Sequence, residues 1–149
     1  MVFNILFIIL TLLVCSYYDL KNKTIPSWAV YPILIVGFLT NILLMATQAD
    51  PFFRYTNLLL ALTIMVIGFF LNQKNILGGG DILLFVGIIL MTPAKLMFPE
   101  FYLGFFFLSC LCGVAYYVVM RLVKKEYANY IKFVPCILIG YIVTLVAFL

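Results

Sequence analysis

The sequence predicts an all-α integral membrane protein, a polytopic bundle of about six transmembrane helices. Of the 149 residues, 67% are hydrophobic and 9% are charged, whereas a typical soluble domain is roughly 45–50% apolar and about 25% charged. The mean hydropathy is +1.26. A soluble fold of this length could not bury so much apolar surface, so lipid has to be the solvent.

Six apolar stretches provide the candidate helices, because crossing the hydrocarbon core takes about 20 helical residues. They are Val2–Tyr18, Pro26–Thr47, Tyr55–Leu71, Ile82–Met97, Phe101–Met120 and Ile131–Leu149. The first lacks the basic start and the cleavage site of a signal peptide, so we expect a retained helix. Pro93 is expected to end or kink the short fourth helix, while Pro32 and Pro135 fall inside the second and sixth. We expect one transmembrane domain over residues 1–149.

Basic residues predict how the chain is oriented in a cell membrane. The first, third and fifth connections hold seven of them, namely Lys21, Lys23, Lys74, Arg121, Lys124, Lys125 and Lys132. The second and fourth hold two, Arg54 and Lys95. Because basic loops stay in the cytoplasm, the odd connections are expected there and both termini outside. Asp19 and Asp81 would then reach the same, cytoplasmic, membrane face.

The residue types exclude several kinds of chemistry. The chain has no histidine, and its four cysteines (Cys15, Cys110, Cys112 and Cys136) lie in apolar stretches without a CxxC pair. We therefore predict no metal site, no cofactor and no disulfide framework. Catalysis by Ser-His or Cys-His pairs is also excluded, so an enzyme would have to use carboxylates or lysines.

The segment Leu77-Gly78-Gly79-Gly80-Asp81 places a carboxylate where the fourth helix begins. Glycines permit φ > 0 and close approach of another chain. A position at a helix N-terminus favours the ionised form of Asp81. Taken alone, the segment could equally be a loop that ends in an N-cap aspartate.

The segment from Tyr18 to Pro26 places a second carboxylate, Asp19, where the first helix ends, and Pro26 near the start of the second. Taken alone, Asp19 could be an interfacial charge neutralised by Lys21 and Lys23. Together the two aspartates indicate a functional site more strongly than either one alone, because ionisable groups at membrane depth are rare and usually functional. Two carboxylates that share a proton are the minimum apparatus of an acid protease.

Tyr18-Asp19 at a helix end, followed by G-x-G-D opening a later helix, resembles the GxGD intramembrane aspartyl proteases. Within them, the pattern D-x-K-x-x-x-I-P of Asp19–Pro26 is similar to the prepilin peptidases. These cleave the leader from type IV prepilins and archaeal preflagellins. The six-helix layout is similar to that family over essentially the whole chain. No part matches the CxxC-containing N-methyltransferase domain of the long bacterial members, so the chain resembles the short, peptidase-only form.

The resemblance implies an aspartic endopeptidase with Asp19 and Asp81 as catalytic pair. It also implies that Gly78 and Gly80 let substrate backbone approach Asp81. Lys21 and Lys23 would either anchor the loop at the cytoplasmic face or attract an acidic residue just after the cut site. The expected partners are membrane lipid and a prepilin-like substrate with an apolar N-terminal helix, with no nucleic acid. The sequence does not decide the oligomeric state.

Two alternatives use the same residues differently. In a small transporter or ion-translocating protein, the two aspartates would bind cations or protons. That hypothesis predicts polar groups near the middle of the bilayer, but the middle parts of the six predicted helices are almost entirely apolar. In a structural membrane subunit, neither aspartate would matter for activity.

Overall fold

The computed structural model describes residues 2–46, 51–74, 77–93, 96, 99–124 and 133–148, without the side chains of 51–54, 123 and 124. These residues form six α-helices and no strand. The helices are α1 (Val2–Asn22), α2 (Ser27–Ala46), α3 (Pro51–Gln73), α4 (Gly79–Met91), α5 (Pro99–Lys124) and α6 (Val134–Phe148). The predicted all-α, six-helix fold class is confirmed.

The six helices differ in length, and α4, which was expected to be short, is the shortest of them. Within the described residues, α1, α2, most of α3 and most of α5 are long and apolar enough to cross a membrane. Helices α4 and α6 have 13 and 15 residues, which is shorter than one crossing needs. The fourth helix was expected to reach Met97 but ends at Met91, two residues before Pro93. Proline disfavours helical backbone in the preceding residue, so the prediction that Pro93 ends this helix is confirmed.

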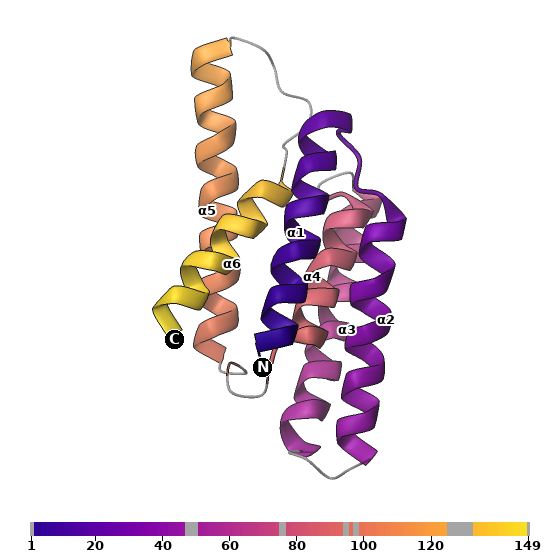
Figure 1. Ribbon diagram of the computed structural model, residues 1–149. Helices are drawn as coiled ribbons and strands as arrows, with labels where there is room; N and C mark the ends of the chain where they lie inside the picture. The colour runs from indigo at the N-terminus through magenta and orange to yellow at the C-terminus, as the bar shows by residue number, and fades with distance from the viewer. Residues whose placement is uncertain are drawn as a thin grey trace.

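The helices form two groups that α1 joins (Figure 1). Helix α4 packs mainly against α2 and α3, while α5 and α6 pack mainly against each other. Helix α1 contacts α6 on one side and α2 and α4 on the other. A site that uses residues of α1, α4 and α6 can therefore form where the two groups meet.

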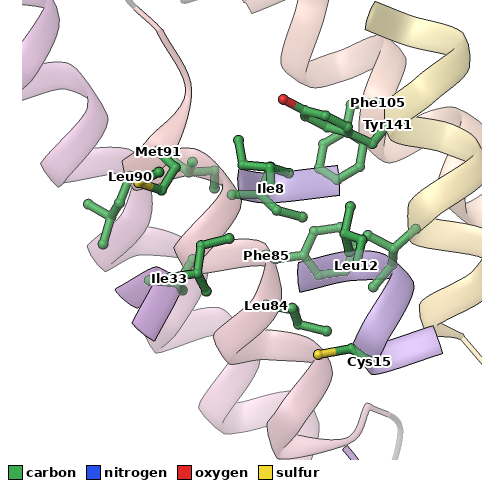
Figure 2. Packing of buried hydrophobic residues seen from close by; sticks show 14 of the residues in the cluster. Ile8, Leu12, Cys15, Ile33, Leu84, Phe85, Leu90, Met91, Phe105 and Tyr141 are labelled. Atoms are coloured by element: carbon green, nitrogen blue, oxygen red, sulfur yellow. The ribbon is translucent and has the colours of Figure 1, made fainter. Parts of the chain in front are cut away.

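The buried core lies between α1, α4 and α6 and extends to α2 and α5 (Figure 2). Ile8 and Leu12 of α1, Leu84 of α4 and Tyr141 of α6 are fully buried. Many large apolar side chains remain exposed on the outer surface, Leu103 and Val146 among them. Such a surface suits contact with lipid, as the four helices long and apolar enough to cross a membrane also do.

Glycines let α2 and α4 approach closely. A Cβ on Gly87 of α4 would stand 2.7 Å from Cγ2 of Ile33, and one on Gly37 of α2 would stand 2.8 Å from Cβ of Leu90. Because lipid offers no hydrophobic drive between helices, such close packing contributes much of their association. The α2–α4 contact therefore fixes one side of the helix that begins with Asp81.

Candidate active site

The structure brings Asp19 and Asp81 together. Asp19 lies in the last turn of α1 and is fully buried, and Asp81 lies in the first turn of α4 with 5% of its surface exposed. The two carboxylates are close enough for the charge of Asp19 to act on Asp81. One correction concerns Asp19 itself. We expected α1 to end at Tyr18, but it continues to Asn22, so Asp19 is inside the helix.

Helix α6 supplies a partner for Asp19. The backbone N–H of Val134, the first residue of α6, donates a hydrogen bond of 3.3 Å to Asp19 Oδ2. The first N–H groups of a helix lack partners within it and lie at the positive end of its dipole. They therefore stabilise an anion, and here they offset the burial of Asp19 at the C-terminal end of its own helix.

Asp81 is held differently. Gly78 precedes α4 in an extended conformation (φ −70°, ψ 142°), and its carbonyl accepts the N–H groups of Asp81 and Ile82 at 3.1 and 3.3 Å. The N-cap residue of α4 is Gly78 and not Asp81, contrary to the simple N-cap interpretation, and the Asp81 carboxylate accepts the backbone N–H of Gly78. Its Oδ1 is buried, and no hydrogen bond reaches it from the described residues. One oxygen of this carboxylate therefore has no fixed internal partner.

The glycines before Asp81 do not have the positive φ that was expected of them. No described glycine has positive φ, and Gly79 and Gly80 already belong to α4. A Cβ on Gly80 would stand 3.0 Å from Cβ and Cδ1 of Ile25, whereas one on Gly79 would have only Asn72 Nδ2 at 3.7 Å. Gly80 is therefore required for close packing on the α1–α2 connection. A Cβ on Gly78 would lie 2.9 Å from Asp81 Oδ2, so Gly78 lies directly beside the carboxylate.

The lysines near Asp19 lie on the surface. Lys21 is exposed, and its ammonium lies 5.8 Å from the centre of the Tyr17 ring. Lys23 has φ 57°, and its N–H donates to the carbonyl of Asp19 at 3.1 Å, which ends α1 in a left-handed cap. Of the other basic residues used for orientation, Lys95, Lys125, Lys132 and the side chains of Arg54 and Lys124 lie outside the described residues.

An apolar cavity of about 360 Å³ includes lining residues that are next in sequence to Asp81 and to Val134. Its lining comes from α3, α4, α5 and the residues before α4 and α6: Ile64, Ile67, Gly68, Leu71, Leu77, Ile82, Phe85, Phe106, Cys110 and Phe133. Ile82 directly follows Asp81, and Phe133 directly precedes Val134, which binds Asp19. One lining residue of the cavity is therefore the chain neighbour of Asp81, and another is the chain neighbour of the residue that binds Asp19.

Sequence reasoning missed several neighbours of Asp19. Cys15 lies one helical turn before it on α1, and Cys136 lies in the first turn of α6; both are within reach of its charge. The spacing of four residues could have indicated Cys15. Nothing in the sequence indicated Cys136 or the N–H of Val134, because both depend on how α6 packs. Within the described part of the chain, no three His, Cys, Asp or Glu side chains are grouped as metal ligands would be.

Comparison with known proteins gives the family. The profile of the type IV leader peptidase family matches residues 6–118, a range that includes both Asp19 and Asp81. Prepilin peptidase EppA of Methanothermobacter thermautotrophicus is 32% identical over 97 residues, which is 62% of this chain. The chain spans about a quarter (25%) of the length of this curated relative. No solved structure gives a significant match. The chain belongs to the type IV leader peptidase family.

Proposed function

We propose that this chain is an intramembrane aspartyl endopeptidase, with Asp19 and Asp81 as its catalytic pair. The observation that supports this most is the meeting of two buried carboxylates from α1 and α4 at one site. Membership of the leader peptidase family supports the same activity. The ion-translocating alternative is not favoured, because nothing in the family match points to it.

The chemistry follows from the proximity of two acids. Close carboxylates in a low-dielectric site hold one proton between them at moderate pH. The ionised carboxylate takes a proton from water, whose oxygen attacks the scissile carbonyl. The protonated partner hydrogen-bonds that carbonyl and stabilises the tetrahedral intermediate. Protonation of the leaving amine then breaks the peptide bond, and the pair returns to its initial state.

We infer that Asp19 is the ionised member of the pair and Asp81 the protonated one. Asp19 accepts an N–H from the positive end of α6. The Asp81 carboxylate accepts the backbone N–H of Gly78, but its Oδ1 is buried without a described hydrogen bond. A buried charge with one unsatisfied oxygen is costlier than a neutral carboxyl group at the same place. This reverses the expectation from the position of Asp81 at its helix N-terminus. Infrared spectra should show a protonated carboxyl band that Asp81→Asn removes and Asp19→Asn keeps; the opposite pattern would exchange the two roles.

The proposed substrate is a type IV prepilin-like or preflagellin-like protein with an apolar N-terminal helix. The apolar cavity lined by Ile82 and Phe133 supports this choice, because an apolar helix could lie against it and these residues are next in sequence to Asp81 and Val134. Lys21 and Lys23 are exposed near the end of α1 and could attract an acidic residue after the cut site.

We assign the site to one transmembrane domain over residues 1–149, in contact with membrane lipid.

The site is proposed to open to the cytoplasm of a multi-pass protein in the cell membrane, with both termini outside. The basic residues of the odd connections support this orientation. A cysteine at the exposed Asn22, in a cysteine-free background, should react in intact cells only with reagents that cross the membrane. Labelling of this cysteine by an impermeant reagent would reverse the orientation.

The direct experiment incubates purified protein with a prepilin-like substrate and identifies the products by mass. The wild-type protein should release the leader, and Asp19→Asn and Asp81→Asn should each abolish release while remaining folded and inserted. Glu100→Gln is the matched control, because Glu100 is an exposed acidic residue in the first turn of α5. Substantial cleavage by either aspartate variant would rule out the paired mechanism.

A further inference from the structure

Helix α4 ends inside the bundle, so the backbone carbonyls of its last turn are buried and need hydrogen-bond donors. At 1.5 Å per residue, its 13 residues span about 20 Å, against roughly 30 Å of hydrocarbon. The last four carbonyls of a helix have no partner within it. All four residues concerned, Ile88 to Met91, are buried. The backbone N–H of Thr92 reaches only the carbonyl of Ile89, at 3.2 Å. Unsatisfied carbonyls at this depth are costly, so side chains must supply the remaining donors.

Side chains from three other helices supply most of these donors. Asn57 of α3 donates to the carbonyl of Ile89 at 3.0 Å, and Asn41 of α2 donates to that of Leu90 at 2.7 Å. Asn4 of α1 donates to the carbonyl of Met91 at 3.1 Å. The hydroxyl of Thr92, just after α4, donates to the carbonyl of Ile88 at 2.7 Å. Each terminal carbonyl of α4 thus accepts one side-chain donor.

The two most deeply buried amides are themselves held in place. Asn57 is 1% exposed, and its Oδ1 accepts the hydroxyl of Tyr102 from α5 at 2.7 Å. Asn41 is fully buried, and its Nδ2 also donates to the carbonyl of Gly37 at 2.8 Å. The absent side chain of Gly37 is what lets α2 approach Leu90 closely enough for this pair of bonds. Each amide therefore has a second hydrogen bond that fixes its orientation toward the carbonyl of α4.

We propose that Asn41 and Asn57 are positioning residues for Asp81. Helix α4 is a short rod with Asp81 in its first turn and the carbonyls bound by Asn57 and Asn41 in its last, about 12–14 Å away along the axis. Packing between apolar side chains is non-directional, whereas these hydrogen bonds specify both the depth and the rotation of the rod. Holding one end of α4 therefore sets where Asp81 meets Asp19 at the other end.

This proposal rests on the proposed peptidase function for its kinetic test. Asn57→Leu and Asn41→Leu keep the approximate shape of the side chain and remove the amide. Each should lower kcat about 10-fold or more with KM nearly unchanged, because a misplacement of about 1 Å at the reacting groups costs up to ~100-fold. Tyr102→Phe should act through Asn57, with a smaller fall in kcat. The double variant Asn57→Leu/Tyr102→Phe should be no slower than Asn57→Leu alone.

Ser109→Ala is the matched control for these variants. Ser109 is fully buried in α5, and its hydroxyl donates to the carbonyl of Phe105 at 2.8 Å within the same helix. The substitution also removes a buried donor to a helix carbonyl, but one without a connection to α4. Its kcat should stay within about 2-fold of wild type. An equal fall in kcat for Ser109→Ala and Asn57→Leu would show general destabilisation and overturn the positioning role.

A distance measurement tests the proposal without relying on activity. Spin labels on cysteines at Asn22 and Gly79, in a cysteine-free background, report the separation between the end of α1 and the start of α4. Both positions are exposed, and a Cβ at Gly79 meets only Asn72 Nδ2 at 3.7 Å. The interspin distance should shift or broaden in Asn57→Leu and stay unchanged in Ser109→Ala.

The possible outcomes separate the two proposals. Folded Asn41→Leu and Asn57→Leu proteins with wild-type kcat and an unchanged distance would overturn the positioning role. A wild-type protein that cleaves no prepilin-like substrate would instead overturn the proposed function, while the distance measurement still decides the role of the amides. If Asn57→Leu does not fold, Tyr102→Phe replaces it, and a wild-type kcat with a wild-type distance there overturns the proposal.

Discussion

Asp19 and Asp81 lie at opposite kinds of helix end. Asp19 lies in the last turn of the long helix α1, where its own helix dipole disfavours a negative charge, and the first N–H of α6 compensates. Asp81 lies in the first turn of the short helix α4, where the dipole favours a negative charge, yet its Oδ1 has no described hydrogen bond. The two ends also differ in backbone strain. The positive φ expected among the glycines occurs instead at Lys23, which follows α1.

The difference shows that the environment of a carboxylate depends more on neighbouring helices than on its own helix. Asp19 is fixed by a donor from α6, a helix that begins more than a hundred positions later in the sequence. Asp81 is fixed through its backbone, because the other end of α4 is bound by side chains of α1, α2 and α3. We therefore expect changes at the two sites to have unequal effects.

The largest effects are expected when each acid is lengthened. Asp81→Glu moves its carboxylate by more than 1 Å and should lower kcat/KM about 100-fold. Asp19→Glu should cost about 10-fold more, because it also loses the hydrogen bond from Val134, which contributes ~1.5 kcal/mol or more. Steady-state kinetics on one prepilin-like substrate provide the measurement. If Asp81→Glu proves the more harmful change, the comparison between the two sites is wrong.

A smaller effect is expected at the glycines that precede Asp81. Gly80→Ala places a methyl group 3.0 Å from Ile25 and should shift the first turn of α4, lowering kcat about 10-fold. Gly79→Ala meets only Asn72 at 3.7 Å and should stay within about 2-fold of wild type. Equal activity of the two variants would show that the Ile25 contact does not hold Asp81 in place.

The smallest effect is expected at the end of α1. Lys23→Gly removes a side chain from the left-handed region and should raise the free energy of unfolding by about 0.5–1 kcal/mol. Asn22→Gly is the control, because a glycine inside α1 should instead lower it by a similar amount. Thermal unfolding in detergent measures both changes. A destabilised Lys23→Gly protein would mean that the lysine side chain stabilises the end of α1 by more than the strain costs.

Much of the fold could be predicted from the sequence, because hydropathy and the positions of Pro and Gly give six apolar helices. The bounds of α4 and α6 could not be read from hydropathy alone, since apolar residues such as Leu96 and Met97 follow Met91. The two aspartates could be selected as a pair because so few charges occur in the chain. The donor from α6 and the amide of Asn57 could not, because they depend on contacts between distant helices. Asn41 does bond to another helix, as its polar nature in an apolar segment suggests.

The central claim is that Asp19 and Asp81 act as one pair that shares a proton, and the pH profile of kcat/KM tests it most directly. The profile should be bell-shaped. At low pH both carboxylates are protonated and no base remains, whereas at high pH both are ionised and no acid remains to bind the carbonyl. The chain has no histidine that could produce either limb. A kcat/KM that falls at both low and high pH supports a pair of aspartates that shares one proton. A kcat/KM that rises with pH to a plateau would contradict it.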